Sequence, residues 1–356
     1  MNRLKNKNIY YFITGAKKAE LASKIIKEMI SEGARVFTIP TQTSLDFIDL
    51  TRIKNIKGNV IKTNWSNKIK LPKEDAVLIA PCTFNTFNSI AIGLANTYPL
   101  CLIASSLGNK VPIFIAPAMN KSLWDHPLIQ KNIKKLEKWN CRVIWPEISD
   151  NKVSMMDVGK ILDTLYFSFK RINYLDRKIR DANLNDRLKV YRKKYFSIFT
   201  DLGKFLSQKN LNLPTAGCTS IRVSEGFLIT SSGAELSNLH QNEISLIVGF
   251  NENDNLIKWV GDKLPSSESP LHSIIQKHKK SKIIVHFHCP KMTYSTNLKR
   301  FNTIKYDRYG TFAIGRQLLK ILGKEKFCIM KYHGEIILGN DNSEIKRTLI
   351  KFDKLA

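Results

Sequence analysis

The stretch Lys263-Leu-Pro-Ser-Ser-Glu268, followed by Val285-His-Phe-His288, organises the C-terminal half of this chain. Because side chains alternate along a strand, His286 and His288 should point to one face while Phe287 points to the other. Two imidazoles on one face of a strand can hold a single divalent metal ion. The alternative is a pair of surface histidines, which is the more common meaning of an isolated His-x-His. The apolar run just before His286 indicates a buried strand and therefore favours the metal site.

Length and composition indicate a folded chain with two domains. The 356 residues suffice for two cores, and 43% hydrophobic with 10% aromatic residues excludes a disordered chain. No apolar run reaches the roughly 18 residues that a membrane span requires. The basic N-terminus leads directly into a strand, without the apolar core of a signal peptide. The six cysteines contain no Cys-x-x-Cys pair, which favours reduced thiols. We therefore expect a cytoplasmic protein and no membrane partner.

The formal net charge of +27 raises the question of nucleic-acid binding. Such a charge can neutralise phosphates. The lysines are nevertheless spread along almost every predicted helix, and asparagine and isoleucine are also abundant. This pattern favours a compositional bias over a dedicated basic surface, so we do not expect nucleic acid as a partner. A general attraction for phosphorylated or carboxylated small molecules is the simpler expectation.

The N-terminal half alternates apolar strands with amphipathic helices. Apolar runs at residues 8–14, 33–40, 75–81 and 111–117 indicate strands that are covered on both faces, and residues 19–31 have helical spacing. This order predicts right-handed crossovers and an open parallel sheet of the Rossmann-like, flavodoxin-like type with flanking helices. Ligands of such sheets bind beyond the carboxyl ends of the strands. The loops after these four strands are therefore the candidate binding loops.

Those loops carry a family resemblance. Residues Ala80-Pro-Cys-Thr-Phe-Asn-Thr86, continuing to Asn96, resemble the flavin-contacting segment of the homo-oligomeric flavin-containing cysteine decarboxylases, the family of phosphopantothenoylcysteine decarboxylase. Ala116-Pro-Ala-Met-Asn120, followed by Trp124 and His126-Pro127, is similar to the substrate signature of that family. The resemblance spans roughly residues 8–165. It implies that FMN is contacted by Thr14, Gly15, Thr83 and Asn85, and a substrate by Asn120. Alternatively, Thr83 and Asn85 could simply cap the following helix.

Two departures from that family concern its reactive residues. The family has a catalytic histidine shortly before the third strand, whereas residues 67–71 contain none and no histidine precedes His126. The family also presents a cysteine on a flap, where residues 152–160 offer methionine, which cannot donate a proton. We therefore predict a flavoprotein-like domain that binds a ligand without carrying out the decarboxylation.

The C-terminal half resembles a second family. Its motifs occur in the order Leu213-Pro-Thr-Ala-Gly-Cys218, Gly226 to Gly233, Pro-Ser-Ser-Glu, His-x-His and Lys331-Tyr-His-Gly334. This order resembles that of the class II aldolase/adducin family, typified by fuculose-phosphate aldolase. The resemblance spans roughly residues 186–350 and implies an α/β/α domain with a mainly antiparallel sheet. It implies Zn²⁺ ligation by His286, His288 and His333, acid/base catalysis by Glu268, and binding of a substrate phosphate or equivalent anion by Ser232, Gly233, Ser266 and Ser267.

The implied roles agree with elementary chemistry. Three neutral imidazoles leave zinc its double positive charge and an open coordination position. The metal can then stabilise an enediolate as a Lewis acid, and Glu268 can move the proton on the neighbouring atom. Ser266 and Ser267 precede the helix of Glu268, where free N–H groups and the helix dipole favour an anion. The alternative for His333 is a structural histidine.

Departures from the second family leave the reaction open. Cys218 stands where the family has an asparagine that contacts phosphate, and cysteine is a poor hydrogen-bond donor. Sugar-phosphate aldolases of the family also use tyrosines as proton donors. Tyr294, Tyr306 and Tyr309 are the candidates here, and the sequence selects none of them. Aldol cleavage, dehydration, decarboxylation and epimerisation therefore all stay possible through the same metal and carboxylate.

The predicted organisation joins two domains through a charged connector. We expect the flavoprotein-like domain at residues 6–168, a charged linker at 169–185 and the class II aldolase-like domain at 186–356, with a core helix at 190–206. The leading hypothesis is a zinc-dependent lyase that acts on a small phosphorylated or carboxylated hydroxy-carbonyl substrate through a metal-stabilised enediolate. The alternative is a non-catalytic binding or regulatory protein built from decarboxylase-like and adducin-like domains. Both resemblances imply a homo-oligomer.

Overall fold

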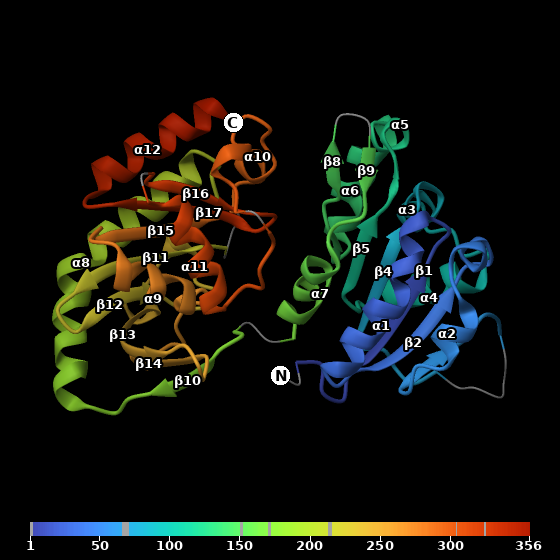
Figure 1. The fold of residues 1–356 in the computed structure, drawn as a ribbon, viewed down its shortest axis with the longest axis horizontal. Coiled ribbons are helices and arrows are strands. Elements are labelled where there is room, and N and C mark those ends of the chain that lie inside the picture. Colours follow the sequence, from blue (N-terminus) through green and yellow to red (C-terminus); the bar gives the residue numbers. More distant parts are fainter. Residues whose placement is uncertain are drawn as a thin grey trace. The chain divides into compact units, whose positions relative to one another are not determined.

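The computed structural model describes residues 3–65, 71–149, 152–169, 172–212, 216–303, 305–323 and 325–356. The chain divides into two compact units, residues 1–170 and 171–356, and each has its own hydrophobic core (Figure 1). Among the described helices, none combines the length and the apolar character that crossing a lipid bilayer requires.

The first unit is built on a six-stranded sheet in which every described pair of neighbours is parallel. All residues of its two central strands are buried, as expected for strands that are covered on both faces. The prediction of an open parallel, Rossmann-like sheet is confirmed. In spatial order the strands are β3 (Asn59–Ile61), β2 (Arg35–Pro40), β1 (Asn8–Ile13), β4 (Ala76–Cys82), β5 (Ile113–Pro117) and β7 (Cys141–Val143).

Helices flank this sheet. The apolar sides of α3 (Phe84–Ala91), α4 (Tyr98–Gly108) and α6 (Pro127–Lys138) share one buried cluster with the strands. Outside this cluster α1 (Ala22–Ser31) and α7 (Val158–Phe167) meet, and the Tyr166 hydroxyl donates to the Glu28 carbonyl at 3.5 Å. The helix expected at 19–31 begins as a 3₁₀ turn. The shorter elements are η1 (Lys17–Leu21), η2 (Gln42–Phe47), α2 (Leu50–Lys54) and α5 (Lys121–Trp124).

A small antiparallel sheet lies beyond the end of β5. It consists of β6 (Met119–Asn120), β9 (Lys152–Ser154) and β8 (Glu147–Ser149), with β9 in the middle. The strand β6 follows directly after β5, so this sheet starts at the carboxyl edge of the parallel sheet. Ligands of parallel α/β sheets bind at that edge.

The second unit contains an eight-stranded sheet that is antiparallel except for one edge pair. The prediction of a mainly antiparallel sheet is confirmed. In spatial order the strands are β10 (Leu175–Lys178), β14 (Leu256–Val260), β13 (Ile244–Asn251), β12 (Gly226–Thr230), β11 (Cys218–Val223), β15 (Ile283–Phe287), β17 (Gly334–Gly339) and β16 (Phe327–Met330).

Helices cover both faces of the second sheet (Figure 1). Phe287 of β15 packs in the cluster that holds α8 (Ala182–Gln208) and α12 (Asn342–Leu355). Ile284 of the same strand packs in the cluster that holds α9 (Ser269–His278) and α11 (Phe312–Ile321). The predicted α/β/α layering is thus confirmed. The remaining elements are η3 (Leu236–Asn238), η4 (Gln241–Glu243), α10 (Pro290–Thr293) and η5 (Lys299–Phe301).

Part of the expected linker is a strand. Residues 175–178 form β10, which pairs with β14 in parallel at the edge of the second sheet, and α8 already begins at Ala182. All four residues of β10 are exposed, so the strand has no apolar face and no alternation that the sequence could reveal. Residues 170 and 171, also within the expected linker, lie outside the described part of the chain.

Candidate functional sites

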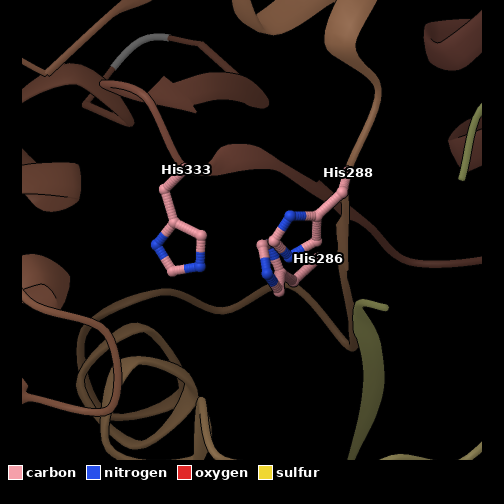
Figure 2. Close-up of side chains that lie close together, drawn as sticks. All are labelled: His286, His288 and His333. Carbon is pink, nitrogen blue, oxygen red and sulfur yellow. The ribbon is translucent and has the colours of Figure 1, made fainter. Parts of the chain in front are cut away.

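Three histidines converge in the second unit. One potential ligand atom of each of His286, His288 and His333 lies within 4.8 Å of the others, and the ring centroids are 4.6 to 5.2 Å apart. Figure 2 shows His286 and His288 close together with the ring of His333 facing them. His286 lies near the end of β15, His288 follows directly after this strand, and His333 lies in the turn between β16 and β17. The shared face of His286 and His288 follows from the strand alternation.

The backbone of β17 orients the first of these rings. Nδ1 of His286 lies 2.9 Å from the Glu335 carbonyl oxygen, which can only accept a hydrogen bond. Nδ1 therefore carries the proton, and Nε2 is left to bind a metal, the usual arrangement for a metal-binding histidine. The neighbouring backbone is held as well, because the His288 N–H donates to Oδ1 of Asn212 at 3.0 Å.

Gly334 allows the close approach of the histidines. A Cβ atom at this position would lie 2.6 Å from the Phe287 carbonyl oxygen, 3.0 Å from Cε1 of His286 and 3.3 Å from Cγ of His288. The first of these distances is a clash with backbone, which cannot move aside easily. The glycine after His333 is therefore a packing requirement of the histidine cluster.

Glu268 lies beside the cluster. Its Oε1 is 3.5 Å from Nε2 of His333, and both side chains are almost completely buried. Glu268 occupies the position just before α9, and its N–H donates to Oγ of Ser266 at 3.2 Å. The structure thus brings the predicted carboxylate to the predicted ligands, although they come from segments that are far apart in the sequence.

The four residues predicted to bind an anion lie on two adjacent segments. The Ser232 N–H donates to the Leu264 carbonyl at 2.9 Å, and the Ser266 N–H donates to the Thr230 carbonyl at 3.0 Å. These bonds place Ser232-Gly233 next to Ser266-Ser267 at the N-terminal end of α9. Gly233 has φ +75°, a conformation that glycine adopts without strain.

Cys218 faces a buried histidine that the sequence analysis did not single out. Its Sγ lies 3.2 Å from Nε2 of His272, and Nδ1 of His272 lies 2.7 Å from Oγ of Ser220. Burial lowers the pKa of His272 to about 3. Burial also raises the pKa of the Cys218 thiol, partly opposed by a hydrogen bond to Ser266. Both groups are therefore neutral near pH 7. Cys218 also pairs with His286 across β11 and β15, so it lies close to the histidine cluster.

Of the three candidate tyrosines, Tyr309 belongs to a loop that contacts the anion pocket. Its carbonyl accepts a hydrogen bond from Nδ2 of Asn173 at 3.2 Å. A Cβ on the following Gly310 would lie 2.9 Å from the Ser267 carbonyl oxygen, so this loop packs directly against Ser267. Tyr294 follows α10 and is 40% exposed, and Tyr306 is half-buried.

The first unit contains a cavity at the carboxyl edge of its parallel sheet. The cavity has a volume of about 800 Å³, and the predicted residues Gly15, Thr83, Asn85 and Asn120 line it together. Thr14 is buried instead, and its hydroxyl donates to the Pro81 carbonyl and accepts from the Thr83 N–H. Thr83 makes no side-chain capping bond to α3, so capping does not account for its hydroxyl.

The flap strand β9 closes one side of this cavity. Val153, Ser154 and Met155 line it, and the described lining residues include neither histidine nor cysteine. Residues 67–70, where a histidine was sought in the sequence, lie outside the described part of the chain. Gly15 and Thr43 also line the cavity, and Gly15 approaches Thr43 so closely that a Cβ would lie 2.8 Å from the Thr43 carbonyl oxygen.

Sequence reasoning also missed two residues that support the histidines. Asn212 holds the His288 backbone, and Glu335 is fully buried in β17. Burial raises the pKa of Glu335 to about 8, against the hydrogen bonds from Thr293 and Cys289. Glu335 could have been noticed in the sequence, because it directly precedes the apolar run Ile336-Ile337-Leu338.

Comparison with known proteins assigns the two halves to different families. Residues 1–169 match the family model described as Flavoprotein, and residues 199–356 match the model described as Class II Aldolase and Adducin N-terminal domain. The chain thus combines a flavoprotein domain with a class II aldolase/adducin domain, as both resemblances imply.

Individual relatives match one half each. The coenzyme A biosynthesis bifunctional protein CoaBC of Thermococcus kodakarensis is 29% identical over 168 residues, 45% of this chain and 41% of the relative. The 5-methylthioribulose-1-phosphate/5-deoxyribulose-1-phosphate aldolase of Rhodospirillum rubrum is 28% identical over 173 residues, 44% of this chain and 76% of the relative. The solved structure of the FMN binding protein AtHal3 has 23% identity and a TM-score of 0.42, covering 48% of this chain and all of that one. The chain therefore spans less than half of CoaBC.

Proposed function

We propose that the second unit is a metal-dependent lyase of the class II aldolase type. Its substrate would be a small phosphorylated or carboxylated hydroxy-carbonyl compound. The observation that carries the proposal is the convergence of His286, His288 and His333, with the Glu268 carboxylate 3.5 Å from the last of them. The family match over residues 199–356 and the aldolase from R. rubrum support it.

The donor set fits a zinc ion. Three imidazole nitrogens that converge within 4.8 Å correspond to the ligand type and number of a catalytic zinc site. The hydrogen bond from His286 to the Glu335 carbonyl leaves the correct ring nitrogen available. Zn²⁺ held by these three residues would supply a Lewis acid for a substrate carbonyl.

The chain's own residues would then position the substrate and move protons. Glu268 is close enough to this site to take a proton from the substrate and return it, as a general base and then a general acid. Ser232, Gly233, Ser266 and Ser267 would bind the phosphate or carboxylate of the substrate, where the α9 dipole favours negative charge. The adjacent Tyr309 loop would cover this end of the site.

Metal analysis of the purified protein tests the proposal. We expect about one zinc per chain, lost in the His286→Ala/His288→Ala double variant, and metal-dependent turnover in a substrate panel that starts from 5-methylthioribulose 1-phosphate. A native protein that binds no divalent metal would instead support the non-catalytic binding or regulatory alternative.

We also propose that the first unit binds FMN without acting as a cysteine decarboxylase. The cavity of about 800 Å³ brings Gly15, Thr83, Asn85 and Asn120 together, but histidine and cysteine are absent from its described lining. Reconstitution with FMN should give a flavin absorption band without decarboxylation of 4′-phosphopantothenoylcysteine. If the purified protein cannot bind FMN, the first unit does not bind a flavin and its role is structural.

The homo-oligomer, the cytoplasmic location and the lack of nucleic-acid binding stay predictions from the sequence. Light scattering on the purified chain tests the first of these. Affinity for random duplex DNA as a function of salt tests the third, because phosphate-driven binding falls steeply as salt rises.

A further inference from the structure

Glu335 places an ionisable group inside a buried strand. All six residues of β17 are buried, and the exposed fraction of Glu335 is 0%. Its neighbours along the strand, Ile336, Ile337 and Leu338, are apolar. Removing a carboxyl group from water is unfavourable unless hydrogen bonds compensate for the loss. The position of Glu335 therefore depends on what its carboxyl group contacts.

The carboxyl group of Glu335 holds the turn that follows His288. One oxygen accepts a hydrogen bond from the Cys289 N–H at 2.8 Å, and the other accepts one from Oγ1 of Thr293 at 2.5 Å. These partners lie at the two ends of α10, a helix of four residues whose own N-cap residue makes no side-chain capping bond. Glu335 thus fixes the direction in which the chain leaves β15.

The backbone of the same residue contacts the other histidine of the pair. The Glu335 carbonyl lies 2.9 Å from Nδ1 of His286, and Glu335 pairs with Phe287 in the β15–β17 register. His333 precedes it by two residues. One residue therefore reaches His286 through its main chain, and the segment after His288 through its side chain.

We propose that Glu335 is the positioning residue of the three-histidine centre. Its carboxyl group holds the Cys289–Thr293 turn and thereby keeps His288 in place beside His286 and His333. This inference rests on the proposed metal-binding function. It goes beyond that function by assigning part of the metal affinity to a side chain outside the ligand set.

An apolar side chain could fill the space of Glu335 but could not accept the same hydrogen bonds. Cys289 and Thr293 are 3% and 7% exposed, so without Glu335 the Cys289 N–H would lack its acceptor in a buried place. The Thr293 hydroxyl would keep only its contact with the Cys289 carbonyl, at 3.1 Å, and would lose its tie to β17. The turn would then shift to find new partners, and His288 is directly attached to it. Mutation of a group that holds a metal ligand in place by hydrogen bonds typically changes metal affinity by about 10–100-fold.

The test measures Zn²⁺ affinity by competition with a chromophoric chelator, and ligand geometry by the visible absorption of the Co²⁺-loaded chain. Glu335→Leu removes both hydrogen bonds, and we expect affinity to fall by about 10–100-fold with a changed Co²⁺ spectrum. Glu335→Gln keeps an acceptor oxygen and should bind within about threefold of the original chain. Thr293→Val removes one of the two bonds and should lie between these variants.

A matched control separates positioning from loss of stability. Leu349→Ala removes buried volume from α12 in the same unit, in the cluster that includes Phe287. It should lower the thermal midpoint without changing Zn²⁺ affinity or the Co²⁺ spectrum. Equal loss of affinity in Leu349→Ala and Glu335→Leu would overturn the proposal.

Each of the remaining outcomes also supports or overturns the positioning role of Glu335. If Glu335→Leu does not fold, Thr293→Val carries the test, and unchanged Zn²⁺ affinity in that variant overturns the proposal. If Glu335→Leu folds and binds Zn²⁺ as the original chain does, the positioning role is wrong while the proposed metal site stands. If the original chain binds no Zn²⁺, the proposed function and this inference fail together.

Discussion

Nε2 of His333 lies 3.5 Å from Oε1 of Glu268, and the two side chains are 7% and 5% exposed. Glu268 is the residue before α9, whereas His333 lies in the turn between β16 and β17. The fold therefore places a carboxylate from one segment beside three histidines from two others. A buried carboxylate beside a reacting group can both take up and return a proton.

Glu268→Gln should separate metal binding from turnover. Glutamine keeps the size of the side chain but cannot accept a proton, so we expect normal zinc content and a turnover about 10²–10⁴-fold lower. Zinc analysis and kcat in the same preparation provide the measurement. Glu225→Gln, on the β11–β12 hairpin where Glu225 pairs with the exposed Arg187, is the matched control. Loss of zinc in Glu268→Gln would mean that Glu268 acts on the site's structure rather than on a proton.

Gly334→Ala should damage both the fold and the metal site. The added Cβ would lie 2.6 Å from the Phe287 carbonyl and 3.0 Å from His286, so strand β17 must shift. Overpacking of this kind costs about 1–3 kcal/mol in the free energy of unfolding. Urea unfolding and zinc titration measure the two effects.

Gly249→Ala is the corresponding control. Its added Cβ would meet only Cδ of the flexible Lys258 side chain, at 3.8 Å. It should change neither stability nor zinc affinity appreciably. Equal behaviour of the two variants would contradict the packing argument for Gly334.

Local patterns predicted a large part of the second site. The alternation around Phe287 placed His286 and His288 on one face, and the structure has their ring centroids 4.6 Å apart. Four strands of the first unit, β1, β2, β4 and β5, followed from apolar runs, and α1 followed from helical spacing. His333 is different, because its approach depends on the pairing of β15 with β17, and only the family resemblance indicated it.

The residues that could not be predicted from the sequence act through contacts between distant segments, which leave no periodic pattern in the local sequence. Glu335 is informative because its partners Cys289 and Thr293 lie on another segment. His272 lies one helical turn after Glu268, but its meaning depends on Cys218 and Ser220 of β11. The edge strand β10 was missed for the opposite reason, because a fully exposed strand leaves no hydrophobic signal.

Cys218→Asn should tighten phosphate binding. The Cys218 thiol lies 3.2 Å from His272, and burial raises its pKa, so it stays a neutral and weak donor. An asparagine keeps an acceptor for His272 and adds an amide donor toward Ser266. One hydrogen bond to a charged group corresponds to roughly a tenfold gain in affinity. The affinity for inorganic phosphate is measured from the rise of the thermal midpoint with phosphate concentration, in the original chain and in Cys218→Asn. Cys218→Ala is the control. Unchanged phosphate affinity in a folded Cys218→Asn variant would show that this residue does not face the anion.

The first unit should lose stability on acidification through the Arg3–Glu32 ion pair. Burial alone would raise the pKa of Glu32, but the hydrogen bonds and charge of Arg3 outweigh it, so the net pKa lies below its ordinary value. A lowered folded-state pKa gives stability that is present above about pH 4.5 and is lost as the pH falls through the folded-state value. Urea midpoints between pH 6 and pH 3 should therefore fall more steeply in the original chain than in Glu32→Gln. Parallel pH profiles of the two proteins would contradict this prediction. Asp163, which also pairs with Arg3, is present in both proteins, so it does not account for a difference between their profiles.

Gly15→Ala should close the cavity of the first unit to FMN. The new Cβ would lie 2.8 Å from both the carbonyl oxygen and Oγ1 of Thr43, so the turn after β1 and the η2 segment must separate. Both Gly15 and Thr43 line the cavity, and a displaced wall should weaken FMN binding at least about tenfold, the loss expected when about 1.4 kcal/mol of contact is removed. Quenching of FMN fluorescence on titration with protein measures the affinity. Gly108→Ala, in a helix where an added Cβ meets nothing within 4 Å, should bind FMN as the original chain does. If Gly15→Ala binds FMN equally well, the flavin does not contact the cavity wall that Gly15 and Thr43 form.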